Sequence, residues 1–278
     1  MNLRAMQHHK IKGGGGVQLH VTETGNANGR PILFIHGFSQ GGYAWSRQLN
    51  SDLANDYRLI AMDMRGHGES EKPRDSYGDS KAWADDVNAV IKALDLRDPI
   101  LVGWSYGPLV ILDYIRHYGE NDIGGVNFVC GLTKLGSDEA TAVIAPAFLS
   151  LVPGFFSEDE NVNRSSLESL LRMCFVNQPS DDEISELVEL AMQTPSHVRQ
   201  ALFSRAFDND DLMSTMKSPV LITHGADDAI VTPSIVNQHK RSMPHAEIHI
   251  MSNTGHAPFY EDAPAYNQRL REFCEAIS

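Results

Sequence analysis

The sequence predicts an α/β protein built on a mainly parallel β-sheet. Short apolar runs alternate with helical patterns along most of the 278 residues, as strands and crossover helices do in such a sheet. The runs end at Gly, Asp, Ser or His, and the carboxyl ends of parallel strands are where these sheets build their sites. One long stretch between two of the runs is helical in pattern, which indicates a segment inserted into the same core.

The strands are expected in the order of the apolar runs. Residues 6–12 and 17–22 predict an opening hairpin, and the glycines at 13–16 predict a flexible turn, because the Lys-Ser/Thr pair and helix start of a phosphate loop are missing. Six later runs predict strands at 32–35, 59–62, 100–102, 126–130, 220–223 and 247–251. Between the first five of these six runs the spacing fits single helices, for example at 80–94 and 108–118.

The stretch between Cys130 and Val220 predicts a helical cap inserted into the sheet domain. It contains helical patterns and no convincing strand, so the rhythm of strand and helix is interrupted there. We place the core domain at residues 1–133 and 213–278 and the inserted cap at 134–212. No linker rich in Pro, Gly and Ser divides the chain into independent domains.

Helix signals recur within the predicted cap. Ser180 followed by Glu183 forms a capping box, and four apolar residues then share one helix face. They are Ile184, Leu187, Val188 and Ala191. Thr194 before Pro195 predicts the start of the next helix. The apolar stretch 143–156 is expected to pack on the main domain, with the lining of a substrate entrance as the alternative.

The composition restricts the class of ligand. A hydrophobic content of 42% is enough for one large core, and the formal net charge of −13 disfavours binding to nucleic acid or to an anionic membrane surface. No apolar run is long enough for a membrane span, and the N-terminal stretch lacks the apolar region of a secretory signal. A cytoplasmic protein acting on a small molecule is therefore expected, as a monomer or homodimer.

The three cysteines predict neither a disulfide framework nor a zinc site. They lie far apart and form no CxxC motif. We interpret them as small apolar residues: Cys130, Cys174 and Cys274.

The pentapeptide GWSYG at 103–107 predicts a nucleophile elbow. It fits G-x-S-x-G, in which a serine sits on a sharp turn between a strand and a helix, and Pro108 follows in the first helical turn. Ser105 is therefore expected to point out of the sheet as a nucleophile. The amide NH of Tyr106 would lie at a helix N-terminus, where positive partial charge favours a developing oxyanion. The alternative is a glycine-rich turn with an idle serine.

A nucleophilic serine needs a base, and the base needs an acid to orient it. We assign His256 as the base, because Gly255 and Pro258 can turn its loop back toward the sheet edge. We assign Asp228 as the acid, because Asp227 falls at the turn after the preceding strand. The order Ser, Asp, His is the one expected when a nucleophile elbow is real. The earlier strand end NFVCGLTK offers no carboxylate, which strengthens this choice.

A second oxyanion donor is expected in FIHGFSQGG, directly after an apolar strand. We assign the amide NH of Phe38, with Gly37 permitting the backbone path; the alternative is that His36 and Gly37 form only a turn. The stretch DMRGHGES is given a structural role, in which Asp63 and Arg65 hydrogen-bond its turn.

Three aromatic residues are candidates for an apolar substrate pocket. Trp104 lies beside the nucleophile, and Phe155 and Phe259 lie in the cap and after the histidine. Side chains of this kind also pack in plain cores.

Together these residues resemble the α/β-hydrolase superfamily over nearly the whole chain. The motifs that carry the resemblance are HGF at 36–38, DMRGHGES at 63–70, GWSYG at 103–107, HGADDAIV at 224–231 and GHAPF at 255–259. Within the superfamily the chain is similar to small esterases, lactone hydrolases and cofactor-free haloperoxidases. The resemblance implies a mostly parallel eight-stranded sheet with a cap after the sixth strand. It also implies the roles given above to Ser105, Asp228 and His256.

The expected activity is hydrolysis of a small carboxylic ester, thioester or lactone through an acyl-enzyme, with no metal and no cofactor. Family members that act on haloalkanes or epoxides use an aspartate at the elbow, so the serine argues against that chemistry. Two alternatives stay open. One is a perhydrolase, haloperoxidase-like enzyme or C–C bond hydrolase with the same three residues, and the other is a slow-turnover ligand sensor.

Overall fold

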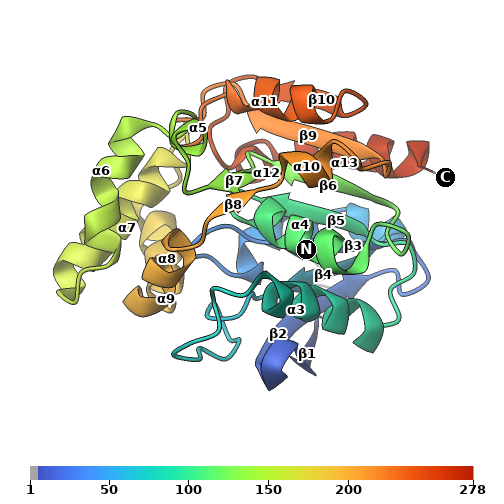
Figure 1. The fold of residues 1–278 in the computed structure, drawn as a ribbon, viewed down its shortest axis with the longest axis horizontal. Helices are drawn as coiled ribbons and strands as arrows, with labels where there is room; N and C mark the ends of the chain where they lie inside the picture. Colours follow the sequence, from blue (N-terminus) through green and yellow to red (C-terminus); the bar gives the residue numbers. More distant parts are fainter. Residues whose placement is uncertain (1–5, 278) are drawn as a thin grey trace.

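The computed structural model describes residues 6–277, and its core is one eight-stranded sheet (Figure 1). The strands lie in the order β1-β2-β4-β3-β5-β6-β9-β10. The β1–β2 and β2–β4 pairs are antiparallel and the others are parallel, so the predicted fold class is confirmed. The strands are β1 (Gln7–Lys12), β2 (Gln18–Gly25), β3 (Pro31–Ile35), β4 (Arg58–Met62), β5 (Ile100–Trp104), β6 (Gly125–Val129), β9 (Val220–Gly225) and β10 (Glu247–Met251).

The central strands are buried along their whole length and are mostly apolar, because both of their faces are covered. Every residue of β3, β5, β6 and β9 is buried. Parallel strands covered on both faces read as continuous apolar runs rather than as alternating ones. Ile35 pairs with Gly103, and Gly103 pairs with Phe128, so the carboxyl ends of three neighbouring strands meet at one edge of the sheet.

Helices of the sheet domain follow the strands. Two that pack against each other are α3, which Asp79 caps by accepting from the Lys81 amide, and α4, with Pro108 in its first turn. The long helices are α3 (Ser80–Ala93), α4 (Gly107–Tyr118), α11 (Ile235–Ser242) and α13 (Ala263–Ala276). The short ones are η1 (Gly14–Gly16), η2 (Gly42–Trp45), α1 (Ser46–Leu49), α2 (Leu53–Asp56) and α12 (Pro258–Glu261).

Most of the chain between β6 and β9 forms a group of helices, α5 to α9, on the left in Figure 1, whereas α10 lies near the middle of the view, close to the sheet. The helices of this stretch are α5 (Asp138–Thr141), α6 (Pro146–Phe155), α7 (Glu160–Met173), α8 (Asp181–Met192), α9 (Ser196–Phe203) and α10 (Asp210–Met213). The expectation of no strand here is wrong, because β7 (Lys134–Leu135) and β8 (Phe207–Asp208) pair as a small antiparallel ladder. Strands of two residues leave no period in a sequence.

Ser180 caps helix α8 as predicted, because its Oγ accepts from the Glu183 amide. Its apolar stripe at 184–191 is buried. The reciprocal half of the capping box is absent from the described contacts, because the Glu183 carboxylate instead contacts Arg47 and the Tyr260 hydroxyl. Helix α9 begins one residue later than the Thr-Pro signal predicts.

The four-glycine turn is held at Gly14, which is buried, whereas Gly15 and Gly16 are exposed with no atoms close to them. The flexibility of this turn stays a prediction. The Gly14 amide donates to Asp86 Oδ1 at 2.8 Å, and Arg65 Nη2 donates to the Gly14 carbonyl at 3.0 Å. Arg65 also binds Asp86 through Nε and donates from Nη1 to the Ser76 carbonyl, so it joins the glycine turn to α3 and to the far end of its own loop rather than bonding the turn at 63–70. Asp63 does bond within that loop, because it accepts from the Glu69 amide.

The ends of the predicted domains, residues 1–5 and 278, lie outside the described residues. Between Met6 and Ile277, none of the helices combines the length and the apolar character needed to cross a bilayer.

Candidate active site

The turn between β5 and α4 holds Ser105 in a strained left-handed conformation, with φ of 56°. Its flanking glycines are required by space. A Cβ on Gly103 would lie 2.7 Å from the carbonyl carbon of Gly107, and a Cβ on Gly107 would lie 2.6 Å from the carbonyl oxygen of Ile35. Strain of this kind is stored where the surrounding structure fixes the backbone, often at functional sites. The turn therefore has the geometry predicted for the elbow.

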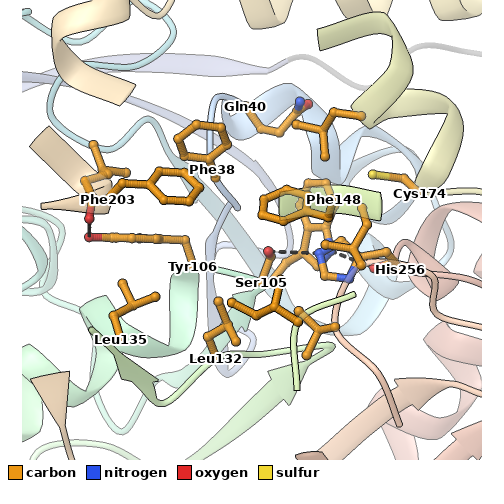
Figure 2. Close-up of a pocket in the computed structure, with 16 residues that line it drawn as sticks. Phe38, Gln40, Ser105, Tyr106, Leu132, Leu135, Phe148, Cys174, Phe203 and His256 are labelled. Atoms are coloured by element: carbon orange, nitrogen blue, oxygen red, sulfur yellow. Dashed lines mark hydrogen bonds between the residues drawn. The ribbon is translucent and has the colours of Figure 1, made fainter. Parts of the chain in front are cut away.

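Ser105, His256 and Asp228 form one hydrogen-bonded chain across three loops. The Ser105 hydroxyl lies 2.9 Å from His256 Nε2, and His256 Nδ1 lies 2.8 Å from Asp228 Oδ2 (Figure 2 shows the first contact). With its proton on Nδ1, the imidazole donates to the carboxylate and its Nε2 can accept from the serine. The structure thus brings together the three residues that the sequence analysis selected.

The Asp228 carboxylate is buried and held in its charged form. Burial by itself would raise the pKa of this group, but His256, together with His224 and the amide of Ile230, lowers the pKa below its ordinary value. The neighbouring Asp227 is exposed. Asp228 is therefore placed to orient the imidazole, and Asp227 is not.

The His256 loop is held by Glu261, a residue that the sequence analysis missed. Its carboxylate accepts from the Gly255 amide at 2.6 Å and from the amides of Val176 and Asn177 at 2.8 and 2.9 Å. One side chain thus ties the histidine loop to the helical segment. A carboxylate five residues after a histidine gives no local signal of this role.

Glu261→Gln is expected to destabilise the fold by about 2 kcal/mol and to lower turnover about tenfold. The amide retains one oxygen and gains an NH₂ group that faces backbone donors, so charge-assisted hydrogen bonds are lost. Denaturant unfolding and an assay of catalytic turnover measure the two effects. Glu272→Gln on the exposed face of α13 is the control, and equal effects in both variants would contradict this role.

The loop after β3 passes directly beside the serine. A Cβ on Gly37 would lie 3.0 Å from Ser105 Cβ, so only glycine fits without displacing the neighbour. His36 fixes this path: its Nδ1 lies 2.8 Å from the Gly37 carbonyl, and its Nε2 accepts from the Met64 amide at 3.0 Å. Phe38 and Tyr106 then both line the space in front of Ser105, where the sequence analysis placed its oxyanion donors.

A cavity opens in front of Ser105 and His256, and its walls are almost entirely apolar (Figure 2). Together with the solvent at its mouth it encloses about 660 Å³ of space. Trp104 is part of the wall, as expected, and its Nε1 donates to the His256 carbonyl at 2.7 Å. The sheet domain contributes Phe38, Gln40, Trp104, Ser105, Tyr106, Leu132, Ile230, Val231 and His256. The segment 134–212 contributes Leu135, Ile144, Phe148, Leu170, Cys174, Leu202 and Phe203.

Two pocket candidates lie one layer behind this wall, which corrects the prediction. The Phe155 ring packs 5.8 Å from that of Phe148, and the Phe259 ring packs 5.0 Å from that of Trp104. Both are shielded from the cavity by the aromatic side chain in front of them. Ile144 and Phe148 of the stretch 143–156 do face the cavity, so that stretch both packs on the main domain and lines the cavity.

Cys130, His224 and Asp228 are a group of potential metal ligands, with donor atoms within 4.8 Å of one another. Their present contacts favour a different arrangement. Asp228 is engaged by His256, His224 Nε2 donates to the Val231 carbonyl, and burial raises the pKa of the Cys130 thiol well above its ordinary value. A neutral thiol is a poor metal ligand, so these residues fit the orientation of Asp228 better than a metal centre.

The sheet topology and the loops at the carboxyl ends of its strands are features by which this chain can be compared with known families. The sequence profile of the alpha/beta hydrolase family matches residues 32–269. The chain therefore belongs to the α/β-hydrolase family of enzymes.

Individual relatives extend over nearly the whole chain. The AB hydrolase superfamily protein YisY of Bacillus subtilis is 27% identical and covers 95% of this chain and 98% of its own. The non-heme chloroperoxidase CPO-A1 of Kitasatospora aureofaciens is 28% identical, with 93% and 96% covered. The crystal structure of the esterase RhEst1 from Rhodococcus sp. has a TM-score of 0.92 and 34% identity, with 98% and 99% covered.

Proposed function

We propose that this protein is a serine hydrolase that cleaves small, apolar carboxylic esters. The observation that carries the proposal is the chain from Asp228 through His256 to Ser105, which ends at the floor of an apolar cavity. A hydroxyl, an imidazole and a carboxylate in this geometry are the groups that acyl transfer requires.

The first half of the reaction forms an acyl-enzyme. His256 Nε2 removes the Ser105 proton as Oγ attacks the ester carbonyl, and Asp228 stabilises the imidazolium. The amides of Phe38 and Tyr106 donate to the oxyanion of the tetrahedral intermediate. The intermediate collapses with transfer of the proton from His256 to the alcohol oxygen, which leaves.

The second half releases the acid. His256 Nε2 takes a proton from water, whose oxygen attacks the acyl carbon, and the same imidazole returns that proton to Ser105 Oγ as the ester bond breaks. The carboxylic acid then leaves, and the serine is restored. None of these steps requires a metal or a cofactor.

The cavity wall supports an apolar substrate of modest size. The space inside the cavity that the centres of water-sized spheres can occupy is about 50 Å³, which restricts the substrate to small groups. Leu, Ile, Val and Phe side chains form most of the wall, so an acyl or alcohol group that is apolar gains by leaving water. We also propose that segment 134–212 serves as the cap, because it supplies one side of this wall.

Perhydrolysis is a second candidate, favoured by the similarity to a non-heme chloroperoxidase over most of the chain. In that reaction hydrogen peroxide would replace water in the second half and release a peracid. Parallel assays of peracid and carboxylic acid from one ester separate the two activities.

A fluorophosphonate probe tests the nucleophile without knowledge of the substrate. Ser105 Oγ attacks phosphorus and fluoride leaves, so wild type is expected to gain the mass of one phosphonyl group in an intact-protein mass spectrum. Ser105→Ala and His256→Ala are expected to gain none.

The control for this experiment is Ser70→Ala, which removes another buried hydroxyl of the sheet domain, one that contacts the Asp63 carbonyl and not the cavity. It should still be labelled. No adduct on folded wild type, with a short alkyl probe that fits the cavity, would contradict the proposal and favour a slow ligand sensor.

A further inference from the structure

The described residues include three arginines that are buried almost completely. Two of them have a carboxylate partner: Arg65 binds Asp86 at 2.7 Å, and Arg205 binds Asp113 at 2.6 Å. The third, Arg199 on α9, has no carboxylate within ion-pair distance among residues 6–277. Buried charges in proteins are normally paired, so this exception needs an explanation.

The guanidinium of Arg199 makes only two hydrogen bonds to described residues, both with neutral groups. Nη2 donates to Asn163 Oδ1 at 2.8 Å, and Nη1 donates to Ser39 Oγ at 3.5 Å. Nε is buried and has no partner. A guanidinium offers five N–H donors, so most of its capacity is unused in a side chain that is 2% exposed.

The charge on Arg199 is therefore uncompensated by the protein itself. Burial lowers the pKa of this guanidinium to about 10, and no neighbouring carboxylate opposes the effect. At neutral pH the group is still charged, and a buried charge that lacks a counter-charge is costly. An anion beside it would remove this cost.

A shallow, solvent-open hollow of about 330 Å³ beside Arg199 has room for such an anion. Its wall includes Arg199 itself, Asn163, and Ser196 in the first turn of α9. Helix α9 starts at Pro195 without a side-chain cap, so the positive end of its dipole is not satisfied by a capping oxygen. A buried guanidinium and an uncapped helix start thus border the same space.

We propose that Arg199 and the start of α9 form a binding site for one small oxyanion, a carboxylate or a phosphate. The guanidinium fork would bind two oxygens, and Ser196 would donate its hydroxyl. The site lies outside the substrate cavity, since Arg199 and Ser196 are not among the residues that line that cavity.

Two glutamates, Glu158 and Glu160, also border the hollow, and either is a possible source of the oxyanion within the chain. Glu160 lies 3.9 Å from Arg164, which offsets its charge. Glu158 is exposed in the turn before α7 and could supply the carboxylate by rotation of its side chain. The source is thus either an anion from solution or Glu158, and in both cases Arg199 binds a carboxylate-type group.

An anion bound at this site would affect a loop next to the active site. Ser39, which accepts from Arg199, follows Phe38 in the chain, has a φ of 55° and donates to the Ala191 carbonyl of α8. The loop that carries the proposed oxyanion donor is therefore held between the sheet domain and the anion site.

Thermal unfolding in inorganic phosphate or acetate, at constant ionic strength set with NaCl, tests the proposal. The Tm of wild type is expected to rise by about 3 °C at tenfold excess over the dissociation constant. Arg199→Met should show no rise. Arg172→Met removes an exposed, paired arginine of the same segment and should respond as wild type does.

Glu158→Gln separates the two sources of the anion. If wild type shows no shift and Glu158→Gln shows one that Arg199→Met abolishes, Glu158 occupies the site in the free protein and the proposal stands. No shift in either protein, or an equal shift in Arg199→Met, would overturn it. If Arg199→Met does not fold, calorimetric titration with phosphate should show about tenfold weaker binding to Arg199→Lys, and equal affinity would overturn the proposal.

Discussion

Ser105→Ala is expected to lower the turnover of an activated ester by about 10⁴-fold or more. The substitution removes the only atom of the hydrogen-bonded chain that can attack a carbonyl carbon. Water in the cavity can replace it only slowly, because it is neither held at 2.9 Å from His256 Nε2 nor converted to an acyl-enzyme. Steady-state hydrolysis of a short p-nitrophenyl ester measures the loss.

The fold should survive this substitution. Alanine carries the same Cβ as serine, so the left-handed turn at 105 keeps its strain and the glycines around it keep their contacts. Circular dichroism and the Tm should therefore match those of wild type. Full retained activity in a folded Ser105→Ala protein would remove this residue from the mechanism.

Asp228→Asn is expected to lower kcat about 10⁴-fold. An amide cannot stabilise the imidazolium, and its NH₂ group would favour the histidine tautomer with the proton on Nε2, where the serine proton must go. The fluorophosphonate labelling rate should fall in parallel with kcat, because both depend on the same activated serine.

Asp227→Asn provides the matched control for the acid. The two residues are adjacent and carry the same charge, but Asp227 is exposed and Asp228 is buried against His256. The Asp227 variant should retain activity within about twofold, because a substitution at an exposed position usually has little effect on the rest of the protein. The reverse order of effects would show that Asp227 orients the histidine.

The sequence predicted the sheet and the hydrogen-bonded chain because both depend on local constraints. Apolar runs covered on both faces give strands such as β3 and β5 without alternation, and the end of each run marks an edge where polar groups gather. Gly103 and Gly107 mark the turn in the sequence, because a residue with a side chain does not fit at either position. Asp228 was preferred to Asp227 because Asp227 falls at the tight turn after β9. In the structure Asp228 faces inward and Asp227 is exposed.

The cavity wall could not be read in the same way, because it depends on contacts between distant segments. Phe148 faces the cavity and Phe155 lies behind it, although both are aromatic residues of α6. Packing against the sheet domain decides which one is in front. Glu261 and Arg199 were missed for the same reason, since their partners lie far away along the chain.

The division of the cavity wall between two parts of the chain has a consequence for how this protein can diversify. The groups that we assign to bond making and breaking lie on loops at the edge of the sheet, whereas side chains such as Phe148, Leu170 and Phe203 come from segment 134–212. Random substitution in that segment can reshape the wall while Ser105 and His256 keep their places. Gene libraries confined to codons 134–212 should therefore yield descendants with new preferences at a lower rate of inactive clones than libraries spread over the whole gene.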